Sequence, residues 1–162
     1  MIVLKTGDGG SGVIALDNMT LARATGIARG CAGIDPWKRY AITANQLESY
    51  LTAIEPGAPR YVLSVDHVIA GAAGFRQDWL RGPYLQFLAI LPEHQRKGLG
   101  QCVLAWFEGM ARARGDKNLW VAASDFNTGA LHFYEQHGFQ RVALLDGLVR
   151  AGFSEVLYRK ML

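Results

Sequence analysis

The sequence is poor in cysteine: it has only Cys31 and Cys102, and they form no CxxC pair. Two isolated cysteines argue against a disulfide framework, a zinc knuckle and a thioredoxin-like motif. No apolar run approaches the ~20 residues that a membrane-spanning helix needs. The N-terminal segment MIVLKTGDGG lacks the basic and apolar regions of a signal peptide. We therefore expect a reduced, cytoplasmic protein without a membrane partner.

Charge and metal-ligand patterns are also sparse. Charged residues make up 19% of the chain, and the formal net charge is +3. Because dense Lys/Arg clustering is missing, we expect no nucleic-acid partner. The four histidines show no metal-ligand spacing, and HFYEQH at 132–137 is not the HExxH motif, so we expect no metal. Half of the residues are hydrophobic, which is enough for a buried core.

The periodicity of apolar residues predicts a single α+β domain over residues 1–162. Residues 1–12 are expected to be a loose leader or an extra strand, with the glycine-rich stretch 6–12 as a turn or mobile loop. Strands are expected at 13–16, 60–65, 68–75, 83–91, 119–124, 139–145 and 153–162. Helices are expected at 20–30, 43–52, 98–114 and 128–137.

Short signals support several of these elements. Thr43 and Gln46 have the spacing of a capping box at a helix start. Asp66 and His67 separate two apolar runs and predict a hairpin turn. Gly115 follows the helical periodicity of 98–114 and is a typical helix stop.

The segment QRKGLG at 95–100 connects a predicted strand to a predicted helix. The first turn of a helix has unpaired N–H groups and partial positive charge, which together favour a phosphate. Gly98 and Gly100 would let a diphosphate approach the backbone, and Arg96 and Lys97 add positive charge. The segment fits neither a Walker A loop nor a Rossmann fingerprint, because Ser/Thr after the lysine and the third glycine are missing.

A second motif, Asn-x-x-Ala-x-x-Phe-Tyr-x-x-x-Gly-Phe, lies downstream. It is formed by Asn127, Ala130, Phe133, Tyr134, Gly138 and Phe139. Each part alone has a structural explanation, such as helix capping by Asn127 or core packing by the aromatic pair. The order and spacing of the two motifs favour a shared functional role.

Together, the two motifs resemble the Gcn5-related N-acetyltransferase (GNAT) family, and the resemblance covers residues 13–162. It implies a mixed, mostly antiparallel central sheet of about six to seven strands flanked by about four helices. The DPW segment at 35–37 and the ending GFSEVLYRKM resemble a bacterial branch of the family whose members mostly have no assigned substrate.

The resemblance also implies acetyl-CoA as cosubstrate. Its pantetheine arm would pair with a bulged fourth strand at Leu88, Ala89 and Ile90. Asn127 would face the pantetheine, and Tyr134 would lie near the thioester sulfur. The pyrophosphate would bind the backbone amides of Gln95, Arg96, Lys97, Gly98, Leu99, Gly100 and Gln101.

The implied reaction is direct transfer of the acetyl group to a primary amine in a ternary complex. A backbone N–H of the fourth strand would stabilise the oxyanion, and Tyr134 would protonate the leaving thiolate as general acid. The glutamate that ribosomal-protein alanine acetyltransferases carry on the fifth strand has no counterpart in LWVAAS at 119–124. Glu155, Asp125 and Asp35 are the candidate bases, and we favour Glu155.

Several alternatives stay open at this point. The chain could be a non-catalytic acyl-CoA-binding sensor or interaction module, although a pure binder would not need Tyr134. The acceptor could be a small-molecule amine or a peptide. Trp37 and Tyr40 could shape the acceptor pocket or belong to the rim of the core. The alternation in 153–162 suits pairing across a homodimer as well as an internal strand.

Overall fold

The computed structural model describes residues 1–5 and 12–162. The predicted glycine-rich loop therefore lies, apart from Gly12, outside the described residues. The helices are α1 Leu21–Ala32, α2 Ala44–Thr52, α3 Leu99–Arg114 and α4 Thr128–Gln136, with a 3₁₀ turn η1 at Pro92–His94. The strands are β1 Ile2–Lys5, β2 Ile14–Asn18, β3 Arg60–Val65, β4 Val68–Trp79, β5 Gly82–Ile90, β6 Asn118–Ser124, β7 Gln140–Asp146 and β8 Ser154–Met161.

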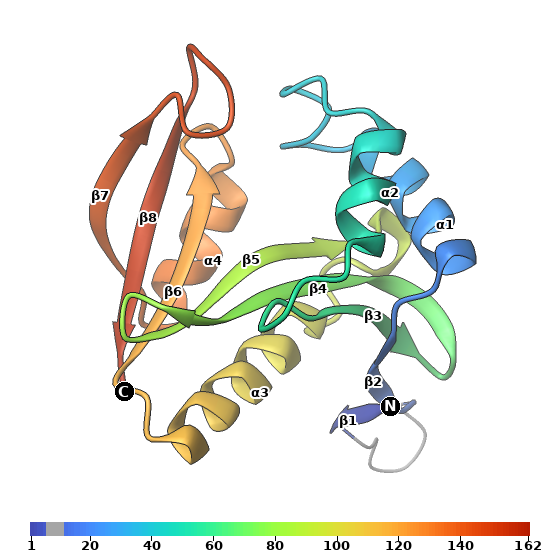
Figure 1. Cartoon of the computed structure of the whole chain (residues 1–162), viewed down its shortest axis with the longest axis horizontal. Coiled ribbons are helices and arrows are strands. Elements are labelled where there is room, and N and C mark those ends of the chain that lie inside the picture. Colours follow the sequence, from blue (N-terminus) through green and yellow to red (C-terminus); the bar gives the residue numbers. More distant parts are fainter. Residues whose placement is uncertain (6–11) are drawn as a thin grey trace.

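All eight strands form one sheet in the order β1-β2-β3-β4-β5-β6-β8-β7. Every neighbouring pair is antiparallel except β5 and β6, which are parallel. Figure 1 shows that β4 and β5 leave one corner of the molecule in a different direction from β6, β7 and β8. The sheet is therefore split into two wings at its only parallel pair.

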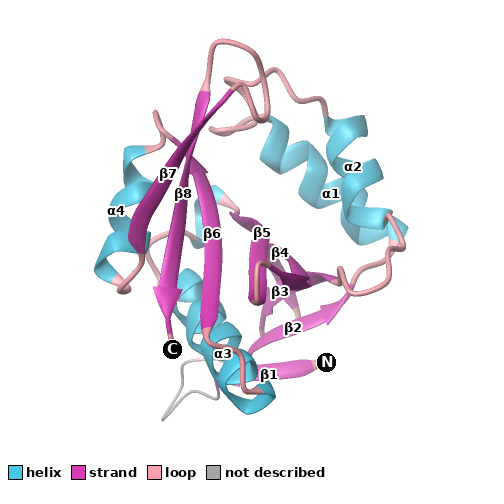
Figure 2. Ribbon diagram, turned by 60° about the vertical axis from the view of Figure 1, so that its left-hand side comes forward, coloured by secondary structure: helices cyan, strands magenta, loops and turns pink. Residues whose placement is uncertain are grey.

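Helices cover both faces of the sheet (Figure 2). One apolar core contains α3 residues such as Val103 and Phe107 together with Leu131 and Tyr134 of α4. The second core lies on the opposite face, where Ile27 of α1 and Leu47 and Leu51 of α2 pack against the sheet. The α+β fold with four helices is thus confirmed.

Local signals in the sequence are also confirmed. The Thr43 hydroxyl accepts a hydrogen bond from the Gln46 amide at 3.2 Å, and the Gln46 side chain accepts from the Thr43 amide at 2.8 Å. Asp66 and His67 form the two-residue turn of the β3–β4 hairpin with φ of 49° and 66°. Gly115 ends α3 with φ of 80°. The capping box and the helix stop use only neighbouring residues, whereas Asp66 also exchanges hydrogen bonds with Val13.

One feature differs from the expectation, and another was left open by the sequence. The sheet has eight strands instead of six to seven, because the leader contributes β1, which pairs with β2. The last strand, β8, lies between β6 and β7, so it is internal, and β7 forms the edge of the sheet. No helix of the described residues is long and apolar enough to span a membrane.

Candidate active site

The two wings of the sheet separate just beyond Leu85. β5 and β6 pair only at Tyr84 with Trp120 and at Leu85 with Val121. On its other side, β5 carries a bulge: Gly74 pairs with Phe87 and Phe75 with Leu85, which leaves Gln86 as the extra residue. Bulges bend a strand and interrupt its ladder. The bulge thus marks where β5 turns away from β6.

Beyond the bulge, β5 directs backbone groups into the gap. Successive residues of a strand point their N–H and C=O groups to opposite edges. The Leu91 amide donates to the Ala70 carbonyl of the β4 side at 2.9 Å, so Ala89 is also directed at β4. Within the predicted trio, Leu88 and Ile90 therefore face the gap, and Ala89 does not. The Ile90 carbonyl already accepts a hydrogen bond from the Gln95 side chain at 2.9 Å.

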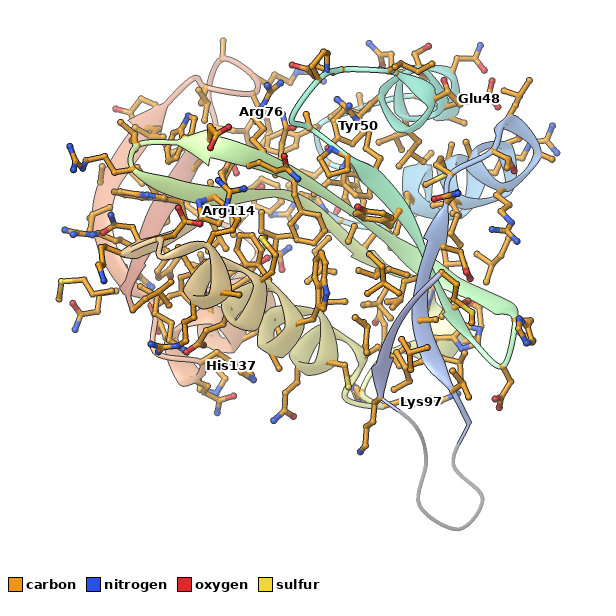
Figure 3. All side chains as sticks on the ribbon, turned by 60° about the horizontal axis from the view of Figure 1, so that its bottom comes forward. Glu48, Tyr50, Arg76, Lys97, Arg114 and His137 are labelled. Carbon is orange, nitrogen blue, oxygen red and sulfur yellow. The ribbon has the colours of Figure 1, made fainter. Side chains whose placement is uncertain are left out.

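The loop before α3 has the shape of an anion site. Arg96 and Gly98 both adopt left-handed backbone, with φ of 60° and 76°, as in the amide-lined concavities called nests. Gly98 is the N-cap of α3 and supplies no capping side chain. Within residues 1–5 and 12–162, no hydrogen bond occupies the amides of residues 96–101. Figure 3 places the exposed Lys97 at the start of α3, opposite Arg114 at its end.

The other predicted loop residues have different roles. The Gln95 amide donates to the Pro92 carbonyl at 3.3 Å and is not free. The Leu99 side chain is 3% exposed and belongs to the core, so only its backbone reaches the loop. A Cβ on Gly100 would come within 3.0 Å of the Phe133 ring. Gly100 therefore allows close packing with α4, whereas Gly98, whose Cβ would meet open space, is the glycine that the loop conformation requires.

A cavity of about 610 Å³ fills the gap between the wings. It brings together Leu88 from β5, Asn127 and Tyr134 from α4, and Glu155 from β8. The loop residues 95–101 do not line it. The site therefore has two parts, a loop with unpaired amides at the start of α3 and a cavity between the wings.

Tyr134 is held firmly in the cavity wall. Its ring packs against Phe139 at 5.8 Å and Tyr158 at 6.1 Å between centroids, and the residue is 7% exposed. Burial, with a smaller contribution from Tyr84, raises the pKa of Tyr134 above that of an ordinary phenol. The hydroxyl is therefore protonated at neutral pH and can donate a hydrogen bond or a proton.

Asn127 combines the two roles that the sequence left open. Its Oδ1 accepts a hydrogen bond from the Ala130 amide at 3.2 Å and caps α4. The same residue lines the cavity. Because the carbonyl is used by the cap, the side-chain NH₂ group is the part of Asn127 that can bind a ligand.

Glu155 lies on β8 directly across from Ser124 of β6. It is 7% exposed, and the Tyr40 hydroxyl donates a hydrogen bond to its Oε1. Burial raises the pKa of the Glu155 carboxyl, and the hydrogen bond from Tyr40 opposes that rise. A carboxyl with a raised pKa is a stronger base than an exposed one when it is ionised.

The two rival carboxylates lie outside the cavity lining. Asp125 is exposed. Asp35 forms an ion pair with Arg39 at 3.3 Å, and its side chain is 46% exposed. Among the described residues, no three His, Cys, Asp or Glu side chains are grouped so that they could hold a metal ion.

The sequence did not reveal several aromatic residues of the cavity. Trp37 and Tyr40 were considered and do line it, but Tyr50, Tyr84 and Phe87 also contribute. The bulge at Gln86 breaks the two-residue alternation of β5, so the sequence pattern alone does not show that Tyr84 and Phe87 share a cavity.

Comparisons with known proteins agree with this geometry. Residues 23–139 match the Acetyltransferase (GNAT) family. A streptothricin acetyltransferase of Streptomyces lavendulae is 28% identical over 103 residues, or 61% of this chain and 54% of the relative, so the match spans about half of that protein. The ribosomal protein bS18 alanine N-acetyltransferase of Escherichia coli is 28% identical over 109 residues, or 67% of this chain and 68% of the relative.

Solved structures share the fold. A GNAT family acetyltransferase of Elizabethkingia anophelis with acetyl-CoA bound superposes with a TM-score of 0.65 at 15% identity, covering 92% of this chain and 98% of the other. The family match begins inside α1 and includes α2 to α4, the loop before α3 and Tyr134. The chain therefore belongs to the acetyltransferase (GNAT) family.

Proposed function

We propose that the protein transfers the acetyl group of acetyl-CoA to a primary amine by direct attack in a ternary complex. The observation that carries this proposal is the opening between β5 and β6. Leu88, Tyr134 and Glu155 line one cavity in this opening. Ile90 and an uncapped helix start follow along the chain.

The chain offers a set of groups suited to coenzyme A. The amides of residues 96–101, together with the Arg96 and Lys97 side chains, would hold the diphosphate. The N–H groups of Leu88 and Ile90 and the Asn127 NH₂ would bind the amide groups of the pantetheine arm. Acetyl-CoA, when bound, supplies an acetyl group activated as a thioester.

Two side chains would transfer protons during the reaction, one as base and one as acid. An alkyl ammonium has a pKa of about 10.4, so the acceptor arrives charged at neutral pH. The Glu155 carboxylate would attract this cation and accept its proton, directly or through water. The Tyr134 hydroxyl would donate a proton to the leaving sulfur. A β5 N–H group in the gap would stabilise negative charge on the carbonyl oxygen.

The relatives support the reaction more than the acceptor. The Streptomyces and Escherichia proteins are both named as acetyltransferases, but for different acceptors. The side chains of the cavity are therefore the features of this chain that select its acceptor.

The test combines binding with turnover. Calorimetric titration with acetyl-CoA measures binding, and release of the CoA thiol with a panel of amines, followed by mass analysis of the product, measures transfer. We expect binding, amine-dependent release and N-acetylated product, with slower turnover in Tyr134→Phe. Binding without transfer to any amine would favour an acyl-CoA sensor. Absence of binding would overturn the assignment of the loop at 96–101.

A further inference from the structure

We infer that the acceptor is a primary amine carried on an apolar, aromatic or aliphatic body with no second charged group beside it. This inference rests on the proposed acetyl transfer and names the substrate class of the same site. It comes from the half of the cavity that faces α1 and α2, where an apolar chamber surrounds a single carboxylate.

This half of the cavity lies on the face of the sheet that α1 and α2 cover. Val156 and Tyr158 of β8 belong to the core beneath α3 and α4. Because side chains alternate along a strand, Glu155 and Leu157 face the opposite side. The hydrogen bond from Tyr40, which belongs to the segment between α1 and α2, agrees with this direction. The carboxylate is therefore directed away from the α3 face and toward α1 and α2.

Aromatic rings form one wall of the chamber. The Phe87 ring lies 4.9 Å from Trp37 and 5.3 Å from Tyr50 between centroids. Trp79 stacks on Tyr84 at 4.8 Å. All five residues line the cavity. Such rings bind apolar and aromatic groups and also attract a cation to their faces.

Aliphatic side chains form the facing wall. Leu145 of β7 lies across from Glu155 in the β7–β8 ladder, and Leu157 follows two residues later on β8. Leu148 and Val149, from the β7–β8 connection, line the same cavity and are 59% and 49% exposed. Exposed aliphatic residues at the cavity mouth are positioned to be covered when an apolar acceptor enters.

The charge of the chamber also favours an acceptor with a single ammonium group. Glu155 is the only carboxylate among the described lining residues, and no Lys, Arg or His side chain lines the cavity. The nearest cations on the Tyr50 side, Arg60 and Arg76, are paired with Glu55 at 3.0 and 2.6 Å. Arg150 donates a hydrogen bond to the Tyr40 carbonyl and does not line the cavity. One ammonium group therefore has a partner inside the cavity, whereas a second ammonium or a carboxylate there would have none.

The first experiment compares kcat/KM for four free amines. 2-Phenylethylamine is the reference, ethylamine removes the ring, phenylalanine adds a carboxylate, and spermidine adds cations. We expect kcat/KM for 2-phenylethylamine to exceed that of each other amine by at least about tenfold. Ethylamine loses the burial of the ring, and phenylalanine and spermidine place a charge in the cavity that has no partner there. Equal or better use of spermidine, phenylalanine or ethylamine would overturn the inference.

A fifth substrate, a peptide, distinguishes a protein N-terminus from a free small-molecule amine as the acceptor. A C-terminally amidated tetrapeptide that begins with phenylalanine has one amine on an apolar residue and no carboxylate. Better use of the peptide than of 2-phenylethylamine would identify a protein N-terminus as the source of the acceptor, and better use of the small amine would identify a free metabolite. If no amine is acetylated at all, the proposed function fails, and this outcome differs from transfer without the predicted selectivity.

Variants test the walls directly. In Trp37→Leu, we expect kcat/KM for 2-phenylethylamine to fall about three- to tenfold more than kcat/KM for ethylamine, mainly through a higher KM. Leu148→Asn should act in the same direction. Its matched control is Leu21→Asn, on α1 outside the cavity, because Leu21 is 64% exposed and should leave both substrates unaffected. Equal losses for both amines would contradict a role in selectivity.

Discussion

The Tyr40 hydroxyl donates a hydrogen bond to the buried carboxylate of Glu155, although the two residues are 115 positions apart. Tyr40 belongs to the segment between α1 and α2, and Glu155 to β8. The Tyr40 ring is also packed edge-on against Phe126 and Phe153, at 5.3 and 5.2 Å between centroids. The contact therefore joins the segment between α1 and α2 to β8 and holds the proposed base in place.

Removal of this hydrogen bond should move the acidic limb of the pH profile. Glu155 must be ionised to act as a base, so activity falls as pH falls through its pKa. Burial raises that pKa, and Tyr40 lowers it. Tyr40→Phe should therefore shift the acidic limb of kcat/KM to higher pH, because the hydrogen bond that lowers the pKa of Glu155 is lost. Tyr61→Phe, in the α3 core, is the control, and a downward shift or none would contradict the role of Tyr40.

Glu155→Gln should lower activity and raise stability at pH 7. Glutamine can still accept the hydrogen bond from Tyr40 but cannot take a proton, so kcat should fall about 10²- to 10⁴-fold. A carboxyl whose folded-state pKa is raised favours folding at low pH, and that contribution is lost as pH rises through the folded pKa. The variant should thus have a higher Tm than the wild type at pH 7, and the difference should shrink in acid.

Asp125→Asn provides the comparison for this variant. Asp125 is exposed and outside the cavity lining, so its charge should matter little for turnover or folding. Full activity in Glu155→Gln together with a large loss in Asp125→Asn would assign the base to Asp125 instead.

Tyr134→Phe should lower kcat at every pH. Burial raises the pKa of Tyr134 above the ordinary phenol range, so its ionisation produces no alkaline limb in the working range. We expect a loss of about 10²-fold in kcat, an unchanged pH profile and little change in acetyl-CoA binding. Tyr158→Phe is a suitable control, because its hydroxyl donates to Glu135 outside the cavity. Full kcat in Tyr134→Phe would remove Tyr134 from proton transfer.

Local sequence rules predicted much of this fold. The capping box at Thr43, the turn at Asp66 and His67, and the helix stop at Gly115 each have a signal within a few residues of sequence. The two motifs also located the helix start at Gly98 and the helix that carries Tyr134. These features could be predicted because the residue types alone restrict the backbone there.

Features that depend on contacts between distant residues could not be predicted from the sequence. The bulge at Gln86 depends on how β4 and β5 pair, and it decides that Leu88 and Ile90, but not Ala89, face the gap. The close approach of Gly100 to Phe133 depends on how α3 meets α4. Periodicity along one segment contains no information about such pairings, so the cavity walls became recognisable only in three dimensions.

Gly98 and Gly115 provide an internally matched test of the anion-binding loop. They flank the two ends of α3 with nearly equal φ, 76° and 80°, and a Cβ on either would meet no atom within 4 Å. Alanine in left-handed backbone costs about 1–2 kcal/mol, so Gly98→Ala and Gly115→Ala should lower the free energy of unfolding by similar amounts in denaturant titrations.

Their effects on acetyl-CoA should differ. Gly98 sets the direction of the unpaired amides that we assign to the diphosphate, whereas Gly115 lies at the end of α3 where carbonyl groups carry partial negative charge. We expect KM for acetyl-CoA to rise by about tenfold or more in Gly98→Ala, since several charge-assisted hydrogen bonds are disturbed together. In Gly115→Ala it should stay at the wild-type value. Equal KM values in the two variants would mean that the start of α3 does not bind the diphosphate, even if the enzyme is active.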